Sequence, residues 1–452
     1  MGKLGIPVAV LFLAGLSACS VNVGGGTDRC APPRGGSDPL SAHDDKPVPT
    51  QVETLTAADA VTFALEYSPV LAAARKKLHQ AAARSAQAGL WPNPTLEFEA
   101  DGIPRRRFGL NTSENSVTLE QEIPLGGRLS AQSAAAAKEW EIEALGADAV
   151  SAAVRAEVET LFYKVLASQE RVRIAEETLA INRELLDAIK ARVEAGGAMM
   201  TDEIKARVET GQTALALARA QAALRLARRG LNLSIGLPEL EVGRYEGDPE
   251  DIGDGTVAPG SAREALVGNP ELKAAEKEKE LAVEQLAIAQ AERIPDVAVR
   301  FGGGRAVELE ETEDGTNHET DYFYTLGISV PVPLFNNNRG AVREAMAGID
   351  RAAAELKVRE ARLTAELEAE LASYDQTVSE VRTFRDSILP DARQALELVR
   401  SGYEAGKFSC LELLDAQRTL VQARQAYADL LEAVHVSRIA LKRLRGAAVD
   451  TP

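Results

Sequence analysis

Side chains that could carry out chemistry are few in this sequence, and they do not gather into a catalytic set. The four histidines are His43, His79, His318 and His435, and the three cysteines are Cys19, Cys30 and Cys410. None of the histidines stands at metal-finger spacing from a cysteine or a carboxylate. No CxxC pair is present, and a disulfide between Cys30 and Cys410 stays open. We therefore expect no enzyme activity and no resident cofactor.

Two similar stretches hold most of the remaining candidates, RVEAGGAMMTDE at 192–203 and GYEAGKFSCLE at 402–412. Gly196 and Gly406 suit the left-handed end of a helix, and Asp202 or Ser409 can cap the helix that follows. The carboxylates just inside these turns are Asp202, Glu203, Glu412 and Asp415. Repeated around a symmetric pore, they would form acidic rings that select cations and act as a gate. Solvated exterior charges are the alternative.

Three residues are weak metal candidates. Met199 and Met200 carry thioethers that suit Cu(I), but a hydrophobic contact with another protein explains this pair equally well. His318 lies in the acidic stretch 308–321, which we expect to be a solvated loop or a weak site for divalent cations. The preceding GGGR at 302–305 lacks the Lys-Ser/Thr of a phosphate loop, so we expect it to end a strand at a loop.

The helices and strands that must position these residues are expected in two copies, because the sequence pattern repeats. Each copy opens with a helical stretch, at 57–94 and 261–296, and continues with two alternating segments. These segments lie at 94–101 and 116–123 in the first copy and at 295–302 and 321–332 in the second. The strand-to-helix junctions are expected at Pro124 with Gly127 and at Pro333 with Asn337, because proline stops a strand and the Gly or Asn break redirects the chain.

The four alternating segments each have an apolar and a polar side. The apolar candidates for one face are Leu96, Phe98, Val117, Leu119, Val297, Val299, Phe301, Phe323, Leu326 and Ile328, and their polar partners are Glu97, Glu99, Thr118, Glu120 and Arg300. This alternation suits strands that cross a bilayer with a wet interior behind them. A small soluble sheet packed on helices is the alternative.

A long helix follows each strand pair. Its heptad positions are Val158, Leu161, Val165, Val172, Ala175, Leu179, Leu186, Ile189 and Val193 in the first copy and Leu367, Leu371, Tyr374, Val378, Val381, Ile388, Ala392, Ala395 and Val399 in the second. Ser168 and Asn182 fill two polar slots, and Arg385 interrupts the second stripe. The pattern predicts coiled-coil packing. About 65–70 residues span on the order of 100 Å, which predicts a rod or the wall of a tube.

The first residues are typical of a secretory signal, with one Lys and a short apolar run before small residues. Leu16-Ser17-Ala18-Cys19 resembles a bacterial lipobox, which implies cleavage before Cys19 and lipidation of its thiol; an ordinary signal peptide is the alternative. The expected divisions are a signal at 1–18, a flexible tether at 19–54, a first repeat at 55–235, an equatorial linker at 236–260, a second repeat at 261–446 and a tail at 447–452.

The net charge and the lengths of the apolar runs narrow the class of protein. The net charge is −17, from 51 basic and 68 acidic residues, which argues against a nucleic-acid partner. No apolar run of 18 residues follows the signal, so a bilayer crossing has to use strands. Four strands cannot close a barrel. We therefore expect an α+β membrane protein, in which a long α-helical coiled-coil barrel continues into a 12-stranded transmembrane β-barrel built by a trimer.

The sequence resembles the TolC-type outer membrane efflux protein family over residues 55–446. The likeness rests on the repeat, on AGLWPNPTLEFE, on the EIPLGGR junction and on GYEAGKFSCLELLDAQRTL. WPNP at 91–94 and IPLGGR at 123–128 resemble the heavy-metal, CzcC/CusC-like branch in particular. The resemblance implies a homotrimer in the outer membrane that extends into the periplasm. It also implies two partners, a periplasmic adapter and a proton-driven inner-membrane pump of the RND class.

The resemblance further implies roles for the two turns. The residues expected to dock on the adapter are Glu194, Gly196, Met199, Met200, Tyr403, Gly406, Phe408 and Ser409. The chain would conduct its substrate passively. Heavy-metal cations are the favoured substrate, and organic toxins or proteins of type I secretion are the alternatives. A periplasmic adapter or a coiled-coil scaffold lipoprotein is the alternative of another class, although adapters carry one helical hairpin and this chain has two.

Overall fold

The structure is a computed structural model, and it describes residues 49–102, 113–252, 262–312 and 315–446, with backbone alone for 262–263, 307–312 and 315–319. Cys19, Cys30, most of the expected tether and the tail lie outside these residues. All described elements belong to one unit, Pro47–Pro452.

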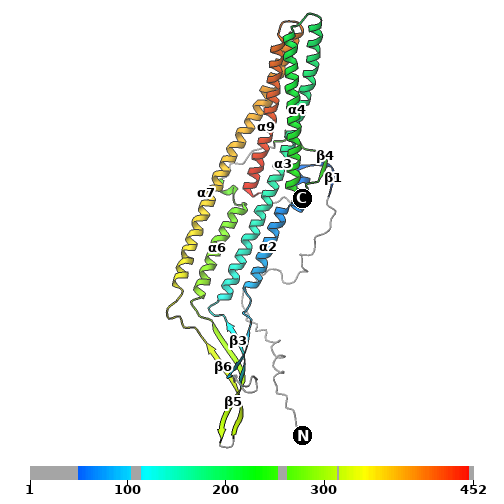
Figure 1. The fold of residues 1–452 in the computed structure, drawn as a ribbon. Coiled ribbons are helices and arrows are strands. Elements are labelled where there is room, and N and C mark those ends of the chain that lie inside the picture. Colours follow the sequence, from blue (N-terminus) through cyan, green and yellow to red (C-terminus); the bar gives the residue numbers. More distant parts are fainter. Residues whose placement is uncertain (1–48, 103–112, 253–261, 313–314, 447–452) are drawn as a thin grey trace. The chain divides into compact units, whose positions relative to one another are not determined.

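The described elements follow one another in the same order twice (Figure 1). The first run is β1 (Gln51–Leu55), α1 (Ala57–Tyr67), α2 (Pro69–Ala88), β2 (Thr95–Asp101), β3 (Glu114–Ile123), α3 (Arg128–Glu194) and α4 (Met200–Ile235). The second is β4 (Glu241–Tyr245), α5 (Ala262–Ala265), α6 (Pro270–Ala291), β5 (Val297–Thr312), β6 (Gly315–Ser329), α7 (Arg339–Thr383), the π turn η3 (Phe384–Ile388), α8 (Leu389–Glu404) and α9 (Cys410–Arg445).

The short helices before the strands break at matching positions in the two copies. The returning helices, α4 and α9, also end at matching positions. Pro69 and Pro270 each occupy the first turn of a new helix, where the missing N–H costs nothing. The returning helices end on Gly236 and Gly446, both left-handed. A Cβ at either glycine would lie 2.3 Å from a backbone carbonyl oxygen just before α2 or α6. Only glycine therefore permits this close approach.

The two long helices differ in continuity. α3 runs unbroken for 67 residues, with Val158, Val165 and Ile189 of the expected stripe fully buried. In the second copy a π turn precedes Pro390, which has no N–H to donate. A π turn inserts one extra residue and rotates all later side chains. Ile388, within the π turn, and Ala395, after it, are exposed in the single chain, so their expected burial is wrong, whereas Ala392 of the same stripe is buried as expected.

The larger sheet is antiparallel, in the order β2-β3-β5-β6. Its register aligns Leu96, Leu119, Phe301 and Leu326 on one face and pairs Glu120 with Arg300 on the other. The expected alternation is thus confirmed, with one exception. Phe323 pairs with Gly304 on the polar face, whereas Tyr322 and Tyr324 stand on the apolar face.

The β5–β6 hairpin is longer than expected. Its pairing continues to Thr312 and Gly315, so the expectation of a loop at 308–321 is wrong. The expectation that GGGR ends a strand is wrong as well. A Cβ at Gly302 would lie 2.7 Å from the carbonyl oxygen of Val117, and one at Gly304 would lie 2.5 Å from that of Asn115. The glycines thus let neighbouring strands pair closely.

A parallel pair, β1–β4, was not expected from the sequence. β1 begins at Gln51 and pairs with β4 inside the linker, so the flexible segment does not extend to residue 54. Leu55 and Tyr245 from this pair enter a buried core with Phe162 and Leu231. The second copy has its own core, formed by Leu266, Leu363, Leu367, Tyr374, Val381, Leu431, Val434, Leu441 and Leu444.

Among the helices in the described ranges, none combines the length and the apolar character needed to cross a membrane.

Candidate functional site

The turns that join α3 to α4 and α8 to α9 share one geometry. Gly196 and Gly406 are left-handed, with φ of 74° and 70°. Just beyond them, the N–H of Gly197 donates to the carbonyl of Arg192, and the N–H of Lys407 donates to that of Gly402, both at 2.7 Å. These bonds satisfy the last carbonyls of the helix. The predicted left-handed helix ends are therefore confirmed.

The caps of the two returning helices differ. Ser409 caps α9 in a reciprocal box, because its N–H donates to the Glu412 carboxylate at 2.7 Å and its Oγ accepts from the Glu412 N–H at 3.3 Å. The N–H and the hydroxyl of Ser409 both donate to the Glu412 carboxylate and lower its pKa. α4 begins after Met199 with no side-chain cap. The expectation that Asp202 caps α4 is therefore wrong: Asp202 is the third helical residue, where the helix dipole favours its charge.

The four candidate carboxylates have separate surroundings in one chain. Glu203 pairs with Arg207 on the next turn. Glu412 is held by its cap, Asp415 is exposed, and Asp202 is half-buried and close enough to Cys410 to raise the pKa of its thiol. Within the described residues no three His, Cys, Asp or Glu side chains form a metal-binding group. The side chain of His318 lies outside the described part of the chain.

The two turns join into one composite tip. Leu186, Ile189 and Ala206 from the first hairpin pack with Cys410 and Leu414 from the second. The guanidinium of Arg192 lies 5.0 Å from the ring centroid of Tyr403. Burial, more than the charge of Asp202, raises the pKa of the Cys410 thiol. A buried neutral thiol is unreactive, so Cys410 serves packing.

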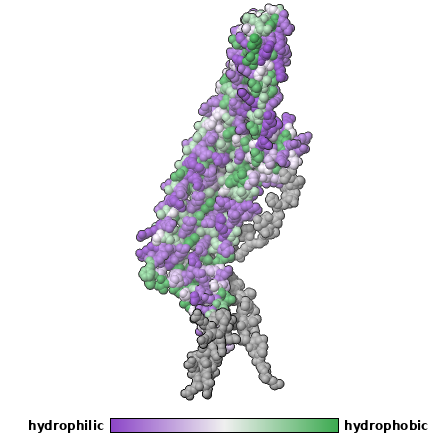
Figure 2. Space-filling model, in the orientation of Figure 1, coloured by the Kyte–Doolittle hydropathy of each residue, from purple (hydrophilic) through white to green (hydrophobic). Residues whose placement is uncertain are grey.

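Six exposed apolar side chains lie at or near the starts of α4 and α9, beside the composite tip. They form the tip patch, and they are Met199 (67 % exposed), Met200 (61 %), Ile204 (51 %), Val208 (55 %), Phe408 (41 %) and Leu411 (55 %). Figure 2 shows green apolar atoms beside purple ones at this end of the helices. Clustered exposed apolar side chains mark an interaction surface. The tip residues Met199, Met200 and Phe408 expected from the sequence all belong to it.

Phe408 is seated by a glycine that the sequence did not single out. Its ring lies against Gly402, where a Cβ would come within 2.1 Å of the ring. The matching residue of the first hairpin is Arg192, which carries a long side chain instead. Gly402 thus fixes the position of Phe408 in the tip patch.

Most of the apolar face of the four-stranded sheet is exposed, whereas Val297 and Val299 near the helices are half-buried. Its most exposed members are Leu96 (70 %), Tyr322 (78 %), Tyr324 (86 %), Leu326 (75 %) and Ile328 (71 %). On the opposite face Arg300 donates to Glu120, and Glu97 and Glu99 are exposed. An exposed face that is mostly apolar, with Gln121 and Arg305 as polar members, suits a nonaqueous neighbour.

The strand-to-helix junctions use left-handed residues. Gly127, with φ of 75°, starts α3 directly after β3 and Pro124. In the second copy Asn338, with φ of 56°, starts α7. Asn337 is therefore not the pivot that the sequence suggested. The side chain of Asn338 donates to the carbonyl of Ala289 at 3.0 Å, which stabilises this conformation.

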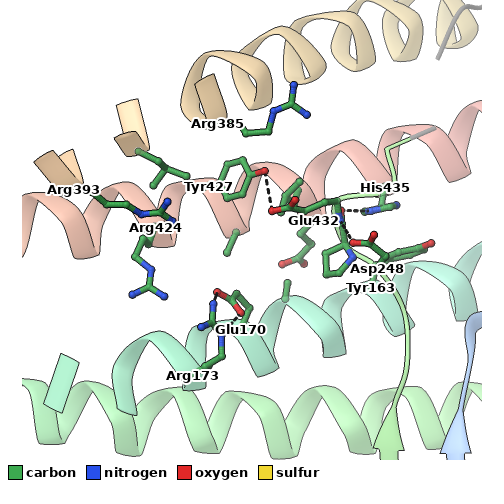
Figure 3. A pocket seen from close by; sticks show the side chains of 16 residues that line it. Tyr163, Glu170, Arg173, Asp248, Arg385, Arg393, Arg424, Tyr427, Glu432 and His435 are labelled. Atoms are coloured by element: carbon green, nitrogen blue, oxygen red, sulfur yellow. Dashed lines mark hydrogen bonds and ion pairs between the residues drawn. The ribbon is translucent and has the colours of Figure 1, made fainter. Parts of the chain in front are cut away.

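A cavity of about 430 Å³ lies where the linker after β4 passes between α3, η3 and α9 (Figure 3). The ring of His435 stacks on Tyr163, with centroids 3.7 Å apart. His435 donates from Nε2 to the carbonyl of Pro249 at 2.8 Å and accepts at Nδ1 from Arg438 at 3.0 Å, so the neutral tautomer fits. Burial lowers the pKa of His435. These contacts clamp the linker to α9.

The polar groups around this cavity are largely used within the protein. Tyr427 donates to Glu250 of the linker at 3.3 Å, and burial, then the charge of Glu250, raises the pKa of Tyr427 to about 12. Three lining arginines form ion pairs, Arg173 with Glu170, Arg385 with Asp386 and Arg424 with Glu177. The arrangement positions the linker. The sequence did not reveal this clamp, because its partners lie far apart along the chain.

Comparison with known proteins identifies the fold and the family. The family model described as "Outer membrane efflux protein" matches residues 61–237 and 262–447. The chain belongs to this family. It is 30 % identical, over 87 % of its length and 90 % of the relative, to the cobalt-zinc-cadmium resistance protein CzcC of Cupriavidus metallidurans.

Two further relatives extend the comparison. The pyoverdine export outer membrane protein OpmQ of Pseudomonas putida is 24 % identical, over 87 % of this chain and 86 % of the relative. A solved structure of CusC superposes with a TM-score of 0.74 at 20 % identity, covering 86 % of this chain and 92 % of that one. The expected resemblance to the outer membrane efflux family, and to its heavy-metal resistance members, is confirmed.

Proposed function

We propose that the protein is the outer membrane exit duct of a tripartite RND-type efflux system, anchored by a lipid on Cys19. The observation that carries this proposal is the joining of an exposed apolar strand face to helices on the order of 100 Å long in a member of this family. The strands suit lipid on one side and a wet interior on the other. The long helices suit a tunnel through the periplasm.

Closure of the duct requires further copies of the chain. Within the described sheet, β2 pairs only with β3 and β6 only with β5, so each outer strand keeps one open edge. Open edges are not tolerated in lipid. Three copies of a duplicated unit would join β6 of one to β2 of the next and close twelve strands.

Heavy-metal cations are the cargo that we propose, since the relative CzcC is named for cobalt, zinc and cadmium resistance and the chain carries a charge of −17. The test is deletion of the protein, with growth measured across zinc, cobalt, cadmium, copper, silver and cationic dyes. We expect metal sensitivity that the wild-type chain restores. Unchanged metal tolerance with new dye sensitivity would instead favour organic cargo, the class to which the pyoverdine exported by OpmQ belongs.

The tip patch is the proposed contact with the adapter. Leu411→Asp places a charge on a side chain that is 55 % exposed, so the fold should tolerate it. We expect loss of adapter co-purification. Leu215→Asp is the matched control, because Leu215 is 61 % exposed on α4 but lies outside the tip patch. Equal co-purification of both variants would remove the patch from the interface.

The half-buried Asp202 is the carboxylate that we propose for cation selection at the tip, while Glu412 mainly caps its helix. Asp202→Asn should weaken block by multivalent cations in planar bilayers. Glu412→Gln is the control, since glutamine can keep the capping box. Identical traces for wild type and Asp202→Asn would exclude Asp202 from the gate.

A further inference from the structure

The cavity beside the linker clamp has the size and the floor of a small-molecule site. Its volume of about 430 Å³ lies within the range of known ligand pockets. Four apolar side chains that are 3–7 % exposed line it, and they are Ala167, Leu389, Ala428 and Leu431. Tyr427 packs against the cluster that contains Leu389. An apolar floor with a few polar groups around it is the usual form of such a site.

The polar groups around this floor leave hydrogen-bond donors in excess. Four carboxylates line the cavity, and each accepts a hydrogen bond from within the chain; they are Glu170, Asp248, Glu250 and Glu432. The lining arginines Arg173, Arg385 and Arg424 have carboxylate partners. Arg393 lines the cavity too, and it makes no hydrogen bond or ion pair with any residue that the structure describes. Because a guanidinium only donates, an anion would satisfy it.

Arg393 lies where an anion and an apolar body could be held together. Figure 3 shows Arg393 and Arg424 at the same end of the cavity, away from His435. Arg424 is neutralised by Glu177 at 2.8 Å, which leaves Arg393 as the uncompensated charge at this end. Leu389 precedes Arg393 by one helical turn and therefore lies on the same face of α8. A group attached to an anion on Arg393 would reach the apolar floor.

The duplication of the chain shows that this cavity is particular to the second copy. Arg424 and Tyr427 of α9 stand where α4 has Ala214 and Leu217. The second copy also contributes η3 to the cavity wall, and π turns are frequent at functional sites. Arg183 stands at the place of Arg393 in the first hairpin but does not line this cavity. The two hairpins thus share the arginine and differ in the floor and the aromatic ring beside it.

We propose that this cavity binds a small organic anion with an apolar body, such as an aromatic or aliphatic carboxylate. Arg393 pairs with the carboxylate, and Leu389 and Leu431 receive the body. A guanidinium and a carboxylate form two parallel hydrogen bonds, which makes this pairing strong and specific. The ligand touches the linker, α3, α8 and α9 at once, so its binding stabilises the linker clamp. This inference does not rest on the proposed duct function, and it does not make the anion the cargo.

Fluorine NMR of the purified full-length protein in detergent supplies the first test. The probes are 4-(trifluoromethyl)benzoate, 6,6,6-trifluorohexanoate and the neutral 4-(trifluoromethyl)benzamide. We expect saturable binding of the carboxylates with a millimolar or lower Kd. The amide should bind about tenfold more weakly or worse, which is the loss expected for a charged hydrogen bond. Absence of saturable binding by both carboxylates, or equal binding of benzoate and benzamide, would overturn the proposal.

A matched pair of variants locates the bound anion. Arg393→Gln and Arg183→Gln each remove an exposed guanidinium that has no partner among the described residues, so the fold should tolerate both. We expect Arg393→Gln to weaken benzoate binding about tenfold or more, while Arg183→Gln binds as the wild type does. Partition into the detergent is common to all samples and cancels. Equal benzoate binding by Arg393→Gln and the wild type would contradict the site.

Hydrogen exchange tests whether the anion acts on the linker. Saturating 4-(trifluoromethyl)benzoate should slow deuterium uptake in residues 246–252 of the wild type and of Arg183→Gln. Uptake in Arg393→Gln should stay as it is without the probe. Unchanged linker uptake in a wild type that NMR shows to be saturated would mean that the anion binds outside this cavity.

Discussion

The two helical hairpins have the same plan but are weakened at different places. The first is continuous along α3, yet α4 has no side-chain cap, and the buried polar pair Asn182 and Thr213 lies between α3 and α4. The second is interrupted by η3, yet Ser409 caps α9, and Ala392 and Ala423 stand at the places of that polar pair. Pro390 stands where α3 has Ala180, and Ser409 stands where the first turn has Met199.

This difference indicates where each hairpin is least stable. A break in the backbone ladder allows bending at one level of the second hairpin. An uncapped helix start instead weakens the first hairpin near its tip. The tip patch draws side chains from both hairpins, so both kinds of movement would reach the same docking surface.

The largest effect is expected in the two cores, where the hairpins do not differ. Leu231 and Leu441 occupy matching places and are 0 % and 5 % exposed. Each change to Ala should lower the free energy of local unfolding by about 2–5 kcal/mol. Hydrogen exchange of α4 and α9 measures the loss, and Leu226→Ala, at a site 71 % exposed on α4, is the control. A loss in only one copy would show that the cores are not equivalent.

The next effect tests the backbone break itself. Ala180 is exposed on α3, so Ala180→Pro changes little besides the ladder. It should cost about 3 kcal/mol and raise exchange around residues 176–180. Pro390→Ala should do the reverse and slow exchange in η3. If α3 accepts proline without loss, continuity does not distinguish the hairpins.

A smaller effect is expected at the caps. Ser409→Ala removes a reciprocal capping box and should destabilise the start of α9 by about 1 kcal/mol. Met199→Ser should strengthen the start of α4 by a similar amount or less. Amide exchange in the first turns of both helices measures these changes. An unchanged α9 start in Ser409→Ala would mean that packing, not the cap, determines this end.

The smallest effect is a pH dependence at the linker clamp. Burial holds the pKa of His435 below its ordinary value of 6.5, with Arg438, Asp248 and Asp251 as the charged neighbours. The unfolded chain takes up a proton near pH 6.5 while the folded chain does not, so stability falls as pH drops below that value. His435→Gln should remove this part of the loss between pH 7 and 5. Parallel pH profiles of hydrogen exchange in the linker for the wild type and His435→Gln would contradict this role of His435.

Local patterns predicted much of this structure. The α3 stripe, the length of α3 and the glycine turns follow from periodicity and turn chemistry within short windows. The face of Phe323 could not be decided that way, because Tyr322, Phe323 and Tyr324 are consecutive aromatics and only the pairing with β5 fixes their register.

Other features depend on contacts between distant segments. β1 and β4 pair across the whole first copy, and the stack of His435 on Tyr163 joins the two copies. The register shift at η3 could have been anticipated from Pro390, whose missing N–H disturbs any continuous helix. The polar position at Asn182 was visible in the heptads, but its hydrogen bond to Thr213 could be found only from the side-chain geometry.

The central claim is that one chain is an incomplete part of a closed duct. Native mass spectrometry of the full-length protein extracted from membranes in detergent tests this claim most directly. The account predicts a complex with three copies of the chain. A single folded copy, with both outer strand edges still unpaired by a neighbour, would contradict it.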